Sequence, residues 1–461
     1  MASFRRPDNF FASSTNPLRF ESELGGSGRG LPEGVPPIPG GGGLPEGVPP
    51  IPGNVQFPPP LPGGLTPQDV NAEQIAALSP EVFGEFQPGQ VEALPSVAVG
   101  SISPAQFAFL PPESMQGFKP NQLGAMPLDV MASFQPAQFM FLPSIAVSGL
   151  NAEQFEALSP EVFEGFQFGH IKKLPTEFFS EFDPKAFEQL SPEAMAGFKP
   201  KTFNALALDV IRSLQPDQLA GLKKQVIKRF EIDQFKALSP DVFGGFQLGQ
   251  IRKLPTDFFS EFDPKAFEQL SPEAMAGFKP KTFNALALDV IKSLQPDQLA
   301  GLKKQIIRRF DSDQFGALPT ESFAGFQDDQ IQALPYDLIA EISPKEFSEL
   351  SSNALSGLMP KAAQNLDPAV FEKLDAVQMG GLKPRTLRKL NPDQVDVIPA
   401  DAFSGMTMDQ GRKMNEVVAS YFDPAQIRSL QLEFLASLPD PVFSLLEDDL
   451  SASQLNGLDN L

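Results

Sequence analysis

Few side chains in this sequence could carry out chemistry, and the only histidine, His170, is the first to consider. A Ser-His-Asp or Cys-His arrangement uses histidine as its base, so such catalysis would have to centre on this residue. His170 stands directly before the apolar Ile171, at the position that Gln250 holds in a near-copy of the segment. We therefore expect His170 to lie on a solvated face, outside any catalytic arrangement.

The other groups that support catalysis or metal binding show no functional spacing. Cysteine is absent, which removes thiolate ligands and disulfides. The acidic run at 447–449 lacks the alternating spacing of a calcium loop, and the glycines of 25–64 form no phosphate-binding loop. Carboxylates recur near expected helix starts, where capping and the helix dipole account for them, as at Glu161, Asp183, Glu188 and Glu193. We expect no enzymatic activity, cofactor or metal.

Basic side chains gather in two near-copies of one segment, which makes them candidate partner-contact residues. They are Lys172, Lys173, Lys223, Lys224, Lys228, Arg229, Arg252, Lys253, Lys303, Lys304, Arg308 and Arg309. The chain has a net charge of −21, so these residues would form basic stripes on an acidic protein. Two interpretations stand: a solvated face, or a contact with an acidic partner such as a neighbouring copy of this chain. The acidic balance argues against nucleic acid, whose phosphates are bound through lysine and arginine.

A strict octad pattern must position these side chains. From Ile75 to Phe443 an apolar residue recurs every eight positions, large except at Ala363, Gly411 and Ala419. A second, large apolar residue follows three positions after each. So short a period predicts a solenoid or array, a class of fold that serves as a rod, scaffold or binding surface.

The common octad, Ser-Pro-Glu-x-Phe-x-x-Leu, carries the signals of a helix N-terminus. A residue such as Ser159 caps the free amide groups, Pro160 takes the first helical position and Glu161 lies near the positive end of the dipole. Where proline is missing, Asn151 and Gln154 occupy the two corners of a capping box. Proline inside a helix costs about 3 kcal/mol, so one continuous helix is excluded. We predict an all-α solenoid of very short, proline-capped helices.

A second period, of two octads, lies inside the first. Phenylalanine at the second apolar position occurs only in alternate octads, as at Phe166 and Phe182, and leucine stands in the octad before each, at Leu158 and Leu174. We interpret this 16-residue period as one coil of the solenoid, with two octads per coil. Phenylalanine would then stack over phenylalanine in one column and leucine over leucine in another. With about 8–10 Å per coil, the array would extend on the order of 200 Å.

The sequence divides into four parts. Residues 1–24 form a basic, aromatic segment suited to docking, and 25–64 hold two copies of LPEGVPPIPG among glycine and proline runs, which predicts a disordered tether. Residues 65–390 form the octad solenoid, in four blocks of ten octads each that begin at 71. Residues 391–461 hold divergent repeats and a C-terminal cap. The second and third blocks are near-copies, which indicates growth by duplication of whole blocks.

The octad resembles the short Leu-Thr-x-x-Gln-Val/Ile-x-x-Leu repeats found in very large bacterial surface and secreted proteins. The segments NAEQFEAL (151–158) and DSDQFGAL (311–318) match this pattern best. The sequence departs from those repeats in its phenylalanine and proline content and its modest length. The resemblance implies an extended structural or adhesive module.

These observations predict a non-enzymatic, elongated repeat protein that acts as a spacer or as a component of a surface layer, appendage or particle. Protein partners or self-association are expected. The alternative is an α-solenoid scaffold that binds peptides or proteins on a concave face. No transmembrane segment is expected, because no window holds eighteen consecutive apolar residues. The N-terminus lacks the apolar core of a secretory signal, and a cell-surface, extracellular or particle-associated location is favoured over the cytoplasm.

Overall fold

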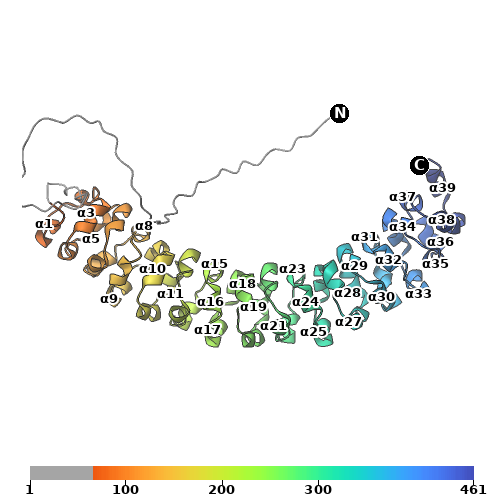
Figure 1. Cartoon of the computed structure of the whole chain (residues 1–461), viewed down its shortest axis with the longest axis horizontal. Helices are drawn as coiled ribbons and strands as arrows, with labels where there is room; N and C mark the ends of the chain where they lie inside the picture. Colours follow the sequence, from red (N-terminus) through yellow and green to blue (C-terminus); the bar gives the residue numbers. More distant parts are fainter. Residues whose placement is uncertain (1–65, 461) are drawn as a thin grey trace, which may run out of the picture. The chain divides into compact units, whose positions relative to one another are not determined.

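The computed structural model describes residues 66–460, which contain short helices and no strand (Figure 1). Each octad from 71 to 446 folds into one α-helix or 3₁₀-helix, the latter labelled η. The expected docking segment 1–24 and tether 25–64 lie outside the described residues. The prediction of an all-α chain of very short helices is confirmed.

The predicted caps define where these helices begin. Asn151 accepts a hydrogen bond from the Gln154 backbone N–H at 2.9 Å, and the Gln154 side chain accepts one from the Asn151 N–H at 3.1 Å. In the proline-containing type, Asp183 accepts from the N–H groups of Lys185 and Ala186 while Pro184 fills the first helical position. Because a new cap follows in the next octad, each helix ends after about one to two turns.

The helices stack in three columns, because each octad packs against the octads three before and three after it. Up to α38, every extensive contact between elements joins members of one column that are three octads apart. One turn of the solenoid therefore contains three octads. The prediction of a 16-residue coil with two octads is wrong.

The first column contains α1 (Ala72–Ala76), α4 (Ser96–Val99), α6 (Pro120–Leu123), η2 (Ala146–Gly149), α10 (Phe168–Lys173), α12 (Pro192–Met195), α15 (Pro216–Gly221), η5 (Pro240–Gly245), α19 (Pro264–Glu268), α22 (Leu288–Ile291), α25 (Ser312–Gly316), α27 (Tyr336–Ala340), α30 (Pro360–Gln364), α32 (Pro384–Leu387), α34 (Met408–Arg412) and α37 (Leu432–Leu435). The second contains α2 (Pro80–Phe83), α5 (Pro104–Ala108), α7 (Leu128–Met131), α9 (Ala152–Glu156), η4 (Thr176–Ser180), α13 (Pro200–Phe203), α16 (Lys224–Ile227), α18 (Leu248–Ile251), α20 (Pro272–Met275), α23 (Pro296–Gly301), η7 (Thr320–Gly325), α28 (Pro344–Glu349), η8 (Pro368–Lys373), α33 (Pro392–Asp396), α35 (Glu416–Ala419) and α38 (Asp440–Leu446). The third contains α3 (Pro88–Ala93), η1 (Pro112–Gly117), α8 (Pro136–Met140), η3 (Pro160–Gly165), α11 (Pro184–Glu188), α14 (Leu208–Arg212), α17 (Ile232–Ala237), η6 (Thr256–Glu261), α21 (Pro280–Phe283), α24 (Lys304–Ile307), α26 (Asp328–Ile331), α29 (Ser352–Ser356), α31 (Ala376–Gly381), η9 (Ala400–Gly405) and α36 (Pro424–Arg428). After α38 come η10 (Glu447–Asp449) and α39 (Ala452–Leu458).

The two-octad period describes how successive turns fit together and does not set the size of a turn. Three is an odd number, so each octad stacks on an octad of the other kind, and no phenylalanine at the second apolar position stacks on another such phenylalanine in its column. In the second column, for example, Phe86, Leu110 and Phe134 follow one another. The expected columns of phenylalanine over phenylalanine and leucine over leucine are therefore also wrong. The first phenylalanine of one octad meets the second phenylalanine of the octad three later, as in Phe139–Phe166 at 4.1 Å and Phe203–Phe230 at 4.9 Å between ring centroids.

Buried glutamines join one turn to the next. Gln106 accepts from the Ser103 N–H with its oxygen, and its Nε2 donates to the carbonyls of Ile75 and Leu78 in the turn before. The same donation, to the equivalent pair of carbonyls in the preceding turn, recurs at Gln122, Gln138, Gln154, Gln218, Gln250, Gln298, Gln330, Gln378, Gln394, Gln410 and Gln426. Each amide thus satisfies buried backbone groups at helix ends, which would be costly to leave unpaired.

Glycines allow the turns to approach closely. A Cβ at Gly245 would lie 1.8 Å from the carbonyl oxygen of Pro216, and one at Gly325 would lie 1.9 Å from that of Pro296. In both pairs the carbonyl belongs to the stacked octad of the turn before. Glycine is needed here for space rather than for an unusual backbone angle.

Candidate interaction surface

The predicted basic residues lie at the ends of α10 and α18 and around α16 and α24. All twelve are exposed except Lys303, which is half-buried. Among the ion pairs of residues 66–460, only Lys304 of this set takes part, with Asp329 at 3.7 Å. The other eleven cations form no ion pair within the described part of the chain.

Residues of α10, α13 and α16, from three successive turns of the solenoid, line a hollow rich in lysine. This hollow of about 200 Å³ is lined by Phe168, Lys172, Lys199, Lys223 and neighbouring residues. The Lys223 ammonium lies 4.3 Å from the centroid of the Phe168 ring and the Lys172 ammonium 5.6 Å from it. Two cations share one aromatic ring, an arrangement that holds them near each other. Lys199 donates from its Nζ to the Lys172 carbonyl at 3.3 Å.

A second, more open hollow of about 610 Å³ continues from the first. It is lined by Ala220, Leu222, Lys223, Lys224, Gln225, Gln247, Gly249 and Gln250. Lys223 and Gln225 line both hollows, and no acidic side chain lines either. We call the two hollows together the lysine groove. It extends from α10 past α13 and α16 to α18.

The fold brings the groove's lysines together because equivalent octad positions stack. Lys199 is the N-cap residue of α13 and Lys223 that of α16, and these helices are neighbours in the second column. Lysine is a poor choice for both positions, since it cannot cap the free amides and its charge opposes the positive end of the helix dipole. Local rules broken in this way are typical of functional positions.

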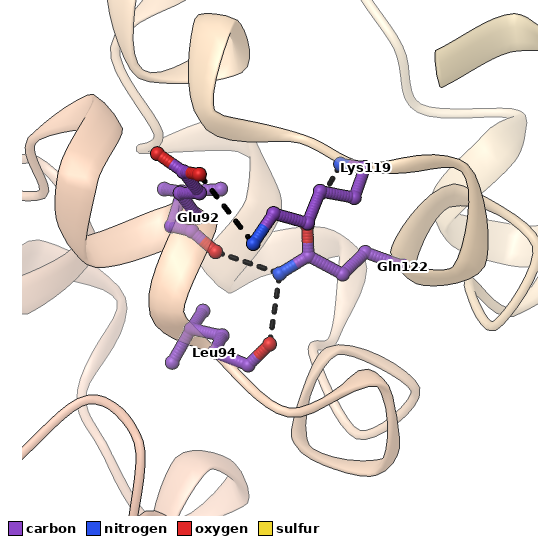
Figure 2. A network of polar contacts seen from close by, with 5 residues as sticks. Glu92, Leu94, Lys119 and Gln122 are labelled. Carbon is purple, nitrogen blue, oxygen red and sulfur yellow. Dashed lines mark hydrogen bonds and ion pairs between the residues drawn. The ribbon is translucent and has the colours of Figure 1, made fainter. Parts of the chain in front are cut away.

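In the first block, the residues equivalent to Lys172 and Lys199 carry opposite charges. Glu92 stands ten octads before Lys172, and Lys119 stands ten octads before Lys199. Figure 2 shows Glu92 and Lys119 as an ion pair, 3.5 Å apart, beside the Gln122 side chain that donates to the Leu94 carbonyl. In the second block the carboxylate is replaced by a lysine, so the pair becomes two cations.

The third block repeats the groove's charges at Arg252, Lys279 and Lys303, but Leu248 stands there in place of Phe168. A block contains ten octads, which is not a multiple of three, so each copy shifts to another column. The α16 lysines lie in the second column, whereas their counterparts at α24 lie in the third. The expected basic stripes therefore face different sides of the solenoid.

His170 is buried, so the expectation that it lies on a solvated face is wrong. Its Nδ1 accepts from the Gln167 N–H at 3.0 Å, and its Nε2 lies 2.8 Å from the Leu142 carbonyl oxygen. It takes the place of a glutamine in the buried series, because imidazole offers an acceptor and a donor at a similar reach. Burial lowers the pKa of His170, although the hydrogen bond to Leu142 acts in the opposite direction. Both ring nitrogens face backbone groups.

Of the residues that line the groove, Lys172, Lys223 and Lys224 belong to the predicted basic set, whereas Lys199 and Phe168 were not predicted. The signal for Lys199 was a lysine at a cap position where serine or aspartate is usual. Lys173, Lys228 and Arg229 line neither hollow. Within residues 66–460 no three His, Asp or Glu side chains lie close enough to hold a metal ion. No helix there is long and apolar enough to span a membrane.

No known family model matches the sequence, and no curated protein is significantly similar to it. The likeness to the octads of bacterial surface proteins therefore stays a prediction that rests on those octads alone.

Proposed function

We propose that this protein is a non-enzymatic structural repeat protein whose solenoid acts as a spacer in a surface layer, appendage or particle. The observation that carries the proposal is that contacts join only neighbouring turns. In such an array each added block increases length without rearranging the rest. The interior is filled by large apolar side chains, including Phe107, Phe139 and Phe203, and so offers core packing rather than a ligand chamber.

The alternative proposal is a scaffold that binds peptides or proteins. The lysine groove favours it, because its hollows are lined by lysines without an acidic side chain, whereas the equivalent pair in the first block, Glu92 and Lys119, is neutralised as an ion pair. The two roles are compatible, since a spacer must be joined to something along its length or at its ends.

Small-angle X-ray scattering of the full-length protein, with its absolute mass, tests the spacer proposal. About sixteen turns at about 8–10 Å each give an array about 130–160 Å long. Deletion of residues 231–310 should shorten it by about 27–33 Å on the same basis. A particle of monomer mass that is compact and hardly shortened by the deletion would overturn the proposal.

A further inference from the structure

We propose that the lysine groove docks the acidic turn Glu447–Asp449 of a second copy of this chain. This inference rests on the proposed structural role, because it supplies the contact by which spacers assemble. The groove presents Lys172, Lys199, Lys223 and Lys224 without a carboxylate in its lining, on a chain whose net charge is −21.

The groove is a place where negative charge is favoured on energetic grounds. Lys172 and Lys223 approach one ring, and Lys199 reaches the Lys172 carbonyl. Like charges gathered around one ring repel each other, and a carboxylate bound beside them would relieve the repulsion through charge-assisted hydrogen bonds. In the first block, where Glu92 stands at the position equivalent to Lys172, the carboxylate forms an ion pair with Lys119.

The acidic turn has the complementary character. Glu447, Asp448 and Asp449 are the only run of three acidic residues in the sequence. Glu447 and Asp448 are exposed, and none of the three takes part in the ion pairs of the described residues. The turn follows directly on α38, where negative charge opposes the negative end of the helix dipole. Cations from a partner would offset that penalty.

The turn and the groove of one chain are too far apart along the array to meet. About eight turns separate α18 from α38, and the contacts of the array join only neighbouring turns. The contact must therefore form between copies, with different surfaces on the two partners. A contact of this heterologous kind extends into open assemblies. The third block keeps the groove's positive charges at Arg252, Lys279 and Lys303, with Leu248 in place of the Phe168 ring, so the test below reverses charges in both blocks.

Sedimentation velocity of the intact protein over a concentration series tests this inference. The wild type should associate at low salt and dissociate at about 0.5 M NaCl, because exposed ion pairs are screened. The groove variant K172E/K223E/R252E/K303E and the turn variant E447K/D448K should each weaken association by about tenfold or more. Mixing the groove variant with the turn variant pairs an acidic groove with a basic turn in one direction and a basic groove with an acidic turn in the other. The mixture should therefore restore association, and one chain with both sets of reversals should restore it as well.

The matched control is K345E/K373E/R388E/K389E, which makes the same change in net charge at exposed residues outside the groove. It should weaken association several-fold less than the groove variant. A wild type that stays monomeric at low salt, a control as weak as the groove variant, or a combined variant without restored association would overturn the inference. A monomer that still scatters as a rod would leave the spacer proposal standing, so the two failures are distinguishable.

Discussion

Deletions that remove an even or an odd number of octads should differ sharply in stability. Three variants remove eight octads (231–294), nine octads (231–302) and ten octads (231–310). In each, the octads of α14, α15 and α16 stack on new neighbours. If only the number of turns mattered, stability would fall steadily as more octads are removed.

The structure predicts instead that the nine-octad deletion is the least stable. In the intact chain Ile211, Leu219 and Ile227 precede Leu238, Phe246 and Leu254 by the same separation that joins the ring pairs Phe107–Phe134 and Phe283–Phe310 between turns. The ten-octad deletion places Leu318, Phe326 and Leu334 at these positions, and the eight-octad deletion places Leu302, Phe310 and Leu318 there. Both preserve the order leucine, phenylalanine, leucine.

The nine-octad deletion reverses that order, because it places Phe310, Leu318 and Phe326 at the three positions. Two sites become overpacked, at about 1–3 kcal/mol each, and one loses the difference between phenylalanine and leucine, about 1 kcal/mol. We expect a loss of about 3–7 kcal/mol at the junction on these values. Urea unfolding followed by circular dichroism measures it. Unfolding midpoints that decrease steadily from eight to nine to ten octads removed would refute the reasoning.

Three further perturbations test single contacts. Gly245→Ala places a Cβ 1.8 Å from the Pro216 carbonyl oxygen and should lower the free energy of unfolding by about 3 kcal/mol. In Gly249→Ala the new Cβ meets nothing within 4 Å, so this control should be neutral or stabilising in the same urea titration. Gln218→Met leaves the Gln215 N–H and the Phe187 and Leu190 carbonyls without their partner and should lower the free energy of unfolding by about 3–5 kcal/mol. The exposed control Gln215→Met should lower it by less than about 0.5 kcal/mol. Equal losses for the two variants would contradict the bridging role of Gln218. His170 has a lowered pKa in the folded protein, so below its ordinary value of 6.5 the unfolded chain binds the proton first and stability falls as the pH falls toward the folded pKa. The slope from this residue is at most about 1.4 kcal/mol per pH unit, and His170→Gln should remove it; an unchanged difference in stability between pH 7 and pH 5 would show that His170 does not titrate on unfolding.

The sequence was sufficient to predict the helices, because the caps and the apolar spacing act within one octad. Asn151 with Gln154 and Asp183 with Pro184 specify their helix starts by local hydrogen bonds. The size of a turn was not predicted, because it depends on contacts between octads that are not adjacent in the sequence. The repeated glutamines at Gln106, Gln122 and Gln138 held this information, but a capping box explains the same residues without reference to another turn.

The candidate surface was predictable only in part for the same reason. Pairs of lysines, such as Lys223 and Lys224, stand out in the sequence as local charge clusters. Lys199 is a single residue that joins them only through the stacking of α13 on α16. His170 was misplaced because its neighbours in sequence do not reveal the Leu142 carbonyl that it meets from the turn before.

Disulfide mapping tests most directly the claim that three octads make one turn, on which the length, the deletion rule and the groove depend. The chain has no cysteine, so engineered pairs report without background. Ser96 and Asn121 lie about three octads apart and share a side-chain hydrogen bond of 2.8 Å. The pair S96C/N121C should oxidise readily, while S96C/E113C, about two octads apart, should stay reduced under the same conditions. Oxidation of the second pair in preference to the first would contradict the three-octad turn.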